Sequence, residues 1–231
     1  MISKKRLNFI ILTVFPEIFS SFISTSLIAK AIESDIINIE LINFRDYAEP
    51  PHYKVDDIVY GGGAGMLLKP EPLAKAIQVA KTKYPNSYTI LLSASGKKLT
   101  QRKCENLSEQ ENIILICGRY EGVDQRVIDL YVDEEIRVGD FVTLGGEVPS
   151  MLLIEATTRL IDNVIGNSES LQEESFSIKF EDQKEMLEGP QYTRPIEFNG
   201  LIVPEVLRSG DHKKIANWRK EQSLLKTNKN K

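Results

Sequence analysis

The sequence predicts an α/β protein built on a parallel sheet, and three observations lead to this fold class. Short apolar runs alternate with stretches of helical periodicity along the first two thirds of the chain. The apolar runs are rich in Ile and Leu and lack the alternation of a half-exposed strand, as expected for parallel strands covered on both faces. With 231 residues, the chain is also long enough to bury a large core.

Four apolar runs are the expected strands, at residues 7–14, 36–44, 88–93 and 112–117. The first run follows three basic residues and so imitates a secretion signal, but it lacks a small-residue cleavage site and stops at Pro16. A buried first strand is therefore the better interpretation. Helical patterns cover residues 17–34, 70–82 and 100–110.

The composition of the sequence changes after residue 165. Residues 166–182 are polar, acidic and without periodicity, which is typical of a flexible linker. We therefore expect a first domain over 1–165, this linker, and a small helical domain over 183–231.

In the expected helical domain, Pro204 can begin a short helix that Ser209 and Gly210 end. Asp211 is then a plausible N-cap for a second helix. The apolar face expected for this helix consists of Ile215, Trp218 and Leu225.

Composition and charge narrow the function classes. The chain is 42% hydrophobic and 27% charged, as in globular proteins, and its net charge of −4 argues against a surface coated in nucleic-acid-binding charge. A local excess of basic residues nevertheless follows residue 207, where only Asp211 and Glu221 are acidic. Two alternatives stay open for this excess, a solvated helix face and an RNA contact. The basic residues are Arg208, Lys213, Lys214, Arg219, Lys220, Lys226, Lys229 and Lys231.

The two cysteines and the hydropathy of the sequence indicate in which cellular compartment the protein is found. Cys104 and Cys117 form neither a CxxC motif nor part of a Cys/His cluster, which fits a reducing cytoplasm and no structural zinc. No stretch approaches the length of a membrane helix. We expect a cytoplasmic protein with no membrane partner and no protein metal site.

The glycine-rich stretch YGGGAGM, at residues 60–66, predicts a backbone that needs positive φ or a close approach. It does not fit a phosphate loop, because Met66 and Leu67 follow where Lys and Ser or Thr are required. It also fails the dinucleotide pattern, whose last glycine would fall on Met66. The acidic pair Asp56 and Asp57 just before it is unfavourable for an anion.

Three further stretches follow or neighbour strand ends, at residues 93–100, 117–127 and 138–149. Each alone is compatible with an ordinary turn. Together they favour a binding site made of loop backbone, because α/β proteins place ligands at the carboxyl ends of parallel strands. The expected ligand is neutral or zwitterionic with an adenine-like edge.

These motifs, YGGGAGM, CGRYEGVDQR, GDFVTLGGEVP, GPQYTRP and VPEVLRSGDHKKIANWR, resemble those of the bacterial tRNA (guanine-N1)-methyltransferase family over about residues 7–226. The resemblance implies a methyltransferase domain with a deep trefoil knot, of the SPOUT class, followed by a small helical domain that binds tRNA. It implies methyl transfer from S-adenosylmethionine to guanine at tRNA position 37, by a homodimer with shared active sites.

The resemblance also assigns residues to the site. Gly61, Gly63 and Gly65 belong to a loop that covers the cofactor and the target base, and Glu121 contacts guanine or a divalent ion, since activity in the family depends on Mg²⁺. Arg119, in the same motif as Glu121, is a candidate for a structural role. The residues that match the family's cofactor pocket are Leu92, Ser93, Gly96, Gly118, Val138, Gly139, Asp140, Phe141, Val142, Thr143, Gly145, Gly146 and Pro149.

Methylation at guanine N1 needs a base for the N1 proton and a cation near O6, and a carboxylate and an arginine suit these tasks. The family's arginine matches Arg159. Its base, usually Asp, matches Glu174, with Glu173 as an adjacent competitor. From the residues alone, Arg159 is a surface arginine and Glu174 a solvated acid. Two alternatives therefore stay open, a knotted methyltransferase acting on ribosomal RNA and an inactive RNA-binding adaptor.

Overall fold

The computed structural model describes residues 6–166, 174–177 and 186–230. Internal contacts divide the chain into two compact units, Met1–Ile165 and Gly166–Lys231. Each unit is described by itself.

The first unit is built on a five-stranded sheet with the order β2-β1-β6-β5-β7. All four neighbouring pairs are parallel, which confirms the predicted α/β fold with a parallel central sheet. Every residue of β6 is buried, which explains an apolar run without alternation. The strands are β1 (Leu7–Thr13), β2 (Ile37–Asn43), β5 (Tyr88–Lys98), β6 (Asn112–Cys117) and β7 (Glu134–Arg137).

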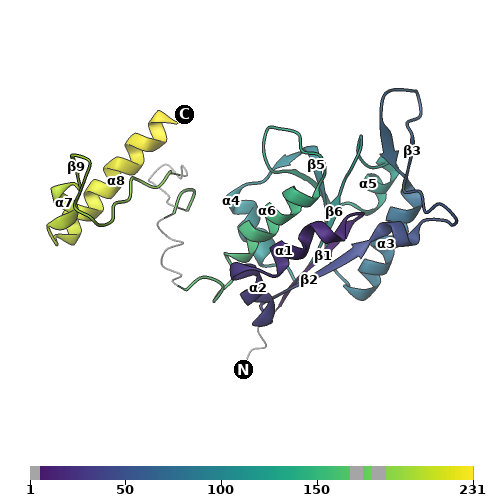
Figure 1. Ribbon diagram of the computed structural model, residues 1–231, viewed down its shortest axis with the longest axis horizontal. Helices are drawn as coiled ribbons and strands as arrows, with labels where there is room; N and C mark the ends of the chain where they lie inside the picture. Colours follow the sequence, from purple (N-terminus) through teal and green to yellow (C-terminus); the bar gives the residue numbers. More distant parts are fainter. Residues whose placement is uncertain (1–5, 167–173, 178–185, 231) are drawn as a thin grey trace. The chain divides into compact units, whose positions relative to one another are not determined.

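Helices cover both faces of the sheet (Figure 1). One face packs Phe9 and Ile11 against Leu153 and Ile154, and the other packs Ile10 and Leu12 in a cluster with side chains of α3 and α5. Alternate residues of β1 therefore serve different cores. The first face carries α1 (Ser20–Ile23), α2 (Ser26–Glu33), α4 (Gln101–Ser108) and α6 (Glu147–Thr158), and the second carries α3 (Pro70–Lys83) and α5 (Gln125–Tyr131).

Two predicted elements differ from the structure. The expected helix over 17–34 is divided into a 3-10 helix, η1 (Pro16–Phe19), and the two helices α1 and α2. The strand expected to end at residue 93 continues to Lys98, with an irregularity in which Leu92 and Lys97 both pair with Ile136. Residues 93–96 therefore bulge out of the sheet. A further 3-10 helix, η2 (Phe44–Tyr47), follows β2.

The glycine-rich stretch joins two short antiparallel strands, β3 (Asp56–Ile58) and β4 (Met66–Leu68). Four glycines in this connection have positive φ, at Gly61, Gly62, Gly63 and Gly65. Residues with a Cβ rarely adopt this conformation, so the turn itself requires glycine.

The second unit contains a hairpin of β8 (Glu197–Phe198) and β9 (Leu201–Ile202), followed by α7 (Glu205–Arg208) and α8 (His212–Lys229). Pro204 precedes α7, and the Asp211 side chain accepts a hydrogen bond of 3.1 Å from the Lys214 amide, as predicted for the N-cap. The predicted apolar face of α8 is wrong at Leu225, which is 63% exposed. Ser223 is buried instead, because its Oγ donates to the Leu187 carbonyl.

The predicted linker over 166–182 lies mostly outside the described residues. Within the described ranges, none of the helices combines the length and the apolar character that crossing a membrane requires.

Candidate functional site

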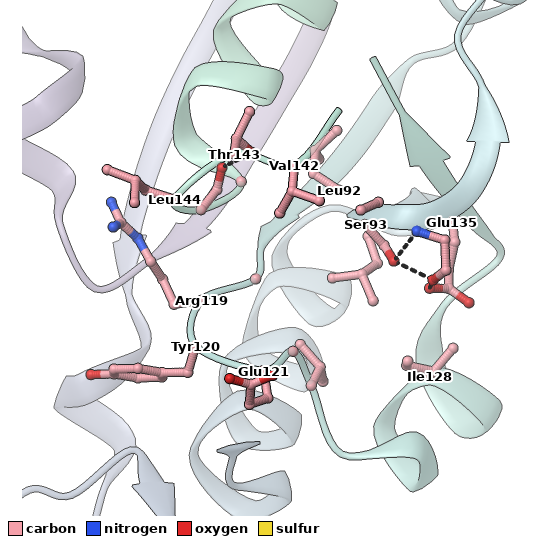
Figure 2. Close-up of a pocket in the computed structure, with 18 of the residues that line it drawn as sticks. Leu92, Ser93, Arg119, Tyr120, Glu121, Ile128, Glu135, Val142, Thr143 and Leu144 are labelled. Atoms are coloured by element: carbon pink, nitrogen blue, oxygen red, sulfur yellow. Dashed lines mark hydrogen bonds between the residues drawn. The ribbon is translucent and has the colours of Figure 1, made fainter. Parts of the chain in front are cut away.

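A pocket of about 470 Å³ opens at the carboxyl ends of β5 and β6, where parallel sheets usually bind ligands (Figure 2). Three segments form most of its wall, residues 91–95, 118–123 and 142–146, and they correspond to the three stretches singled out in the sequence. Gln125, Ile128 and Glu135 complete the lining. The sequence therefore predicted where the pocket forms.

The segment 118–123 is fixed by hydrogen bonds to β4. The Glu121 amide donates to the Met66 carbonyl at 2.9 Å, and the Leu68 amide donates to the Gly122 carbonyl at 3.0 Å. A Cβ on Gly65 would lie 2.3 Å from Oε1 of Glu121. The glycine-rich hairpin thus borders the pocket at Glu121, and a side chain at Gly65 would displace the Glu121 carboxylate.

The segment 142–146 is held against the end of β6. The Gly146 amide donates to the Gly118 carbonyl at 2.9 Å, and Thr143 Oγ1 donates to the Gly145 carbonyl at 2.9 Å. A Cβ on Gly146 would lie 2.6 Å from the Cα of Cys117, a backbone atom that cannot turn aside. Only glycine fits this approach.

A buried ion pair lies beside these loops. Arg119 Nε is 2.9 Å from Oε2 of Glu147, and the Glu147 side chain is only 2% exposed. Thr13 Oγ1 donates to the other carboxylate oxygen at 2.9 Å. The guanidinium of Arg119 also stacks over the Phe15 ring, 4.6 Å from its centroid. Because Glu147 lies in the first turn of α6, the helix dipole also favours its charge.

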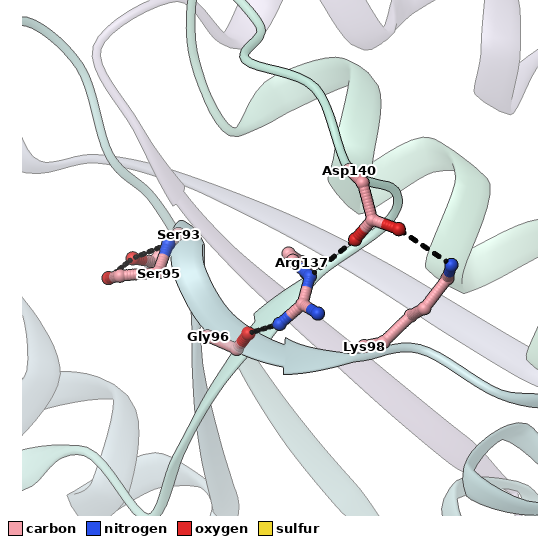
Figure 3. Close-up of polar contacts among 6 residues, drawn as sticks. All are labelled: Ser93, Ser95, Gly96, Lys98, Arg137 and Asp140. Atoms are coloured by element: carbon pink, nitrogen blue, oxygen red, sulfur yellow. Dashed lines mark hydrogen bonds and ion pairs between the residues drawn. The ribbon is translucent and has the colours of Figure 1, made fainter.

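A smaller hollow of about 30 Å³ adjoins the bulge of β5 and includes Val138, Phe141 and Pro149 in its lining. Beside it, Asp140 accepts hydrogen bonds of 3.0 Å from both Lys98 and Arg137, and Arg137 also donates to the Gly96 carbonyl (Figure 3). The hydrogen bonds from Lys98 and Arg137 lower the pKa of Asp140 below its ordinary value. This network ties the loop after β7 to the bulge of β5.

The structure brings most of the expected cofactor residues to these two hollows. The main pocket is lined by Leu92, Ser93, Gly118, Val142, Thr143, Gly145 and Gly146, together with the expected substrate residue Glu121. The smaller hollow is lined by Leu92, Ser93, Val138, Phe141, Thr143 and Pro149.

Gly96, Gly139 and Asp140 line neither hollow. A Cβ on Gly96 would meet the backbone of Glu135 at 2.4 Å, and one on Gly139 would meet the Phe141 ring at 2.1 Å, so both glycines serve loop packing. Gly61 and Gly63 lie in the exposed connection of the hairpin, with no atom within 4 Å of an added Cβ.

Of the two expected catalytic residues, Arg159 is not in the pocket lining, and Glu174 is not part of the first unit. Arg159 is the C-cap of α6, whereas the pocket contacts the N-terminal end of that helix at Gly146. At 1.5 Å per residue, the helix separates these ends by about 20 Å. Glu174 belongs to the second unit, where Ser177 donates to its carbonyl at 3.1 Å. Glu173 lies outside the described residues.

Sequence reasoning missed several residues of the pocket, among them Tyr120 and Glu135. Tyr120 has a positive φ of 59°, an unusual conformation for a residue with a large side chain. Its position inside the motif CGRYEG could have identified it as a pocket residue. No sequence motif marks Glu135, because it reaches the pocket from β7, a strand that was not predicted.

Comparisons with known proteins place the chain in a family. The family model described as tRNA (Guanine-1)-methyltransferase TrmD matches residues 7–231. A tRNA (guanine-N(1)-)-methyltransferase of Carboxydothermus hydrogenoformans is 50% identical over 217 residues, covering 94% of this chain and 83% of that protein. The protein of that name from Borreliella burgdorferi is 47% identical over 224 residues, covering 97% and 91%.

Among solved structures, the tRNA (m1G37) methyltransferase from Aquifex aeolicus superimposes with a TM-score of 0.75 at 37% identity, covering 92% of this chain and 87% of that one. With a family model that spans nearly the whole chain and relatives close to half identical, this protein belongs to the TrmD family of tRNA (guanine-1)-methyltransferases.

Proposed function

We propose that this protein transfers a methyl group from S-adenosylmethionine to N1 of guanine 37 in tRNA. The observation that carries the proposal is the pocket at the ends of β5 and β6, formed by the motifs that the chain shares with a family of this activity. The named relatives and the Aquifex aeolicus structure support the same substrate and the same position.

The main pocket fits S-adenosylmethionine in size and chemistry. Its volume of about 470 Å³ lies within the usual range for small-molecule sites. The carboxylate of Glu135 lines it and suits a ligand that carries a sulfonium and an ammonium group, while Arg119 suits its carboxylate. Gly118 and Gly146 put backbone without side chains into this part of the wall, which leaves room for a flat adenine ring. When bound, S-adenosylmethionine supplies the methyl group.

In this proposal, the chain's own residues position the guanine and accept the proton from its N1 atom. Glu174 takes the proton from N1, and Arg159 opposes the negative charge that develops on O6. Glu121 holds the base, and the hairpin with Gly61, Gly63 and Gly65 covers it. Such a displacement is accelerated mainly by positioning.

The proposal includes a homodimer in which each site takes residues from both subunits. Val148 and Leu152 lie one helical turn apart on α6, 63% and 45% exposed, and Leu144 in the loop before the helix is 93% exposed. An exposed apolar row of this kind is typical of a subunit interface. A second subunit would also supply what one chain's pocket lacks, because Arg159 lies at the far end of α6.

The proposal also includes the family's trefoil knot and a role for Mg²⁺. The knot is proposed from the family resemblance, and the loop that would form part of it runs from Gly118 to Gly146, whose backbones are joined by a hydrogen bond. Among the described residues, no group of three His, Cys, Asp or Glu side chains could hold a metal ion. Mg²⁺ would therefore take its ligands largely from RNA, with Glu121 as one protein contact.

Primer extension on a tRNA transcript tests the function. After incubation with the protein and S-adenosylmethionine, we expect reverse transcription to stop at guanine 37, and to read through when the transcript carries adenine there. Modification of ribosomal RNA instead would favour the first alternative. Binding of tRNA without any modification would favour the inactive adaptor.

A further inference from the structure

The second unit contains its own pocket, of about 340 Å³, separate from the site described above. Four segments enclose it, residues 190–196, Val203 after the β8–β9 hairpin, the end of α7 and the first half of α8. Its lining combines aromatic rings with three arginines, Arg194, Arg208 and Arg219, and contains no acidic residue.

The aromatic pair lies in the pocket wall and remains partly accessible. The ring centroids of Tyr192 and Trp218 are 6.2 Å apart with an interplanar angle of 55°, so the rings are tilted and do not cover each other. Tyr192 is 48% exposed. A flat ligand can therefore stack on either ring.

The scaffold holds this pair in place. The Leu187 amide donates to Thr227 Oγ1 at 2.9 Å, and Ser223 donates to the Leu187 carbonyl. A Cβ on Gly189 would lie 3.2 Å from Gln222. These contacts fix the segment before Tyr192 along α8, so the pocket is part of the folded unit.

The charge of the pocket lining indicates which class of ligand the pocket binds. Arg194 and Arg208 are exposed, and neither forms an ion pair with any residue in the described parts of the chain. Arginine pairs well with phosphate oxygens and stacks on bases, and aromatic rings bind unstacked bases with little sequence preference. A nucleotide offers both groups at once.

We infer that this pocket binds one unpaired nucleotide of the RNA substrate, with its base on Trp218 or Tyr192 and its phosphates on Arg194 and Arg208. The inference rests on the proposed tRNA substrate and adds a second contact outside the methyl-transfer site. The pocket gives the second unit a function that a basic helix face alone does not have, which is to bind an unpaired base. A duplex cannot fill the pocket because it has no free base to insert.

Trp218 is the only tryptophan in the chain, so its fluorescence reports on this pocket directly. We expect a full-length tRNA transcript to quench its emission and to shield it from acrylamide, with a midpoint that matches tRNA binding measured by filter retention. A blunt RNA duplex without unpaired nucleotides should leave the emission unchanged. Emission unaffected by saturating tRNA, or changed equally by the duplex, would overturn the inference.

Variants separate stacking from charge. Tyr192→Leu and Arg208→Gln should each weaken tRNA binding about tenfold, whereas Tyr192→Phe, which keeps the ring, should bind normally. Lys213→Gln removes a charge from an exposed residue of α8 outside the pocket and is the matched control. Losses no larger than that of the control would contradict a built pocket.

The two proposals can fail separately. Normal methylation at guanine 37 with an unresponsive Trp218 would reject the nucleotide pocket and leave the function intact. Quenching by tRNA without methylation would support the pocket and reject the function. Calorimetry with S-adenosylmethionine should give the same affinity for all four variants, because none of them lies in the methyl-transfer pocket.

Discussion

Arg119 Nε lies 2.9 Å from Glu147 Oε2, and this pair joins the end of β6 to the start of α6 beneath the loops of the pocket. Removing one partner of a buried ion pair leaves the other charge uncompensated, at a cost of about 3–5 kcal/mol. We expect Arg119→Met to lower the free energy of unfolding by about this amount in urea denaturation. Arg126→Met, which breaks the exposed pair with Asp124, should cost less than about 1 kcal/mol. Equal losses in the two variants would contradict the structural role of Arg119.

A substitution at Gly146 tests whether the pocket binds S-adenosylmethionine. Gly146→Ala places a Cβ 2.6 Å from the Cα of Cys117, so the segment 142–146 must move away from β6. We expect affinity for S-adenosylmethionine, measured by calorimetry, to fall at least tenfold. Gly166→Ala, whose Cβ meets no atom within 4 Å, is the control. Gly139→Val is a weaker test, because its Cβ meets the exposed ring of Phe141, which can rotate.

Glu174 is tested by removing its charge while keeping its shape. Glu174→Gln should bind S-adenosylmethionine and tRNA normally but methylate about a hundredfold more slowly in single-turnover assays, the usual effect of losing a general base. Glu173→Gln should be mild. The reverse result would assign proton removal to the neighbouring residue.

Shared active sites predict complementation between two defective proteins. A heterodimer of Gly146→Ala and Glu174→Gln subunits, assayed at an S-adenosylmethionine concentration too low to fill the altered pocket, would have one site with both defects and one with neither. Random pairing makes half of the dimers mixed, so activity should recover to roughly a quarter of the wild-type value. Mixtures proven to contain heterodimers but still inactive would show that each subunit completes its own site.

Glu134 makes the first unit sensitive to acid. Burial raises its pKa, but hydrogen bonds from Lys103 and Tyr88 outweigh this effect, and the net pKa is lowered. A lowered pKa contributes stability at pH values above the ordinary pKa, and this contribution is lost as the pH falls through the folded value. Glu134→Gln should therefore lower the melting temperature at pH 7 and hardly at pH 3. Exposed Glu109→Gln should change neither, and a constant difference for Glu134→Gln at both values would contradict the assignment.

The sequence predicted three strands of the sheet well because composition alone marks them. β1, β2 and β6 are Ile-rich and Leu-rich runs whose ends differ from the predicted limits by one residue at most. β7 was not predicted, because it is short and acidic. α6 was expected only through the family resemblance, as a helix after the motif GDFVTLGGEVP, since a glycine pair precedes it and Pro149 lies in its first turn.

The sequence predicted the three loops that form the pocket, but it predicted the contacts between individual side chains less well. Glycine spacing located the segments that meet in the pocket, but the pairing of Arg119 with Glu147 depends on how β6 and α6 pack. Such a pair leaves no local pattern, since its members belong to different motifs. For the same reason, no local pattern indicates that Tyr192 lies against Trp218.

The order of strands in the sheet has a consequence for how the protein is made. β1 lies between β2 and β6, and Asn8 pairs with Asn112, so one edge of the first strand stays open until residues 112–117 have been synthesised. At 5–20 residues per second, ribosomes need roughly 5–20 s to add those ~100 residues. Nascent chains that end before β6 therefore expose a strand of apolar residues whose backbone groups are unpaired on one edge, and we expect them to be clients of chaperones that bind extended segments.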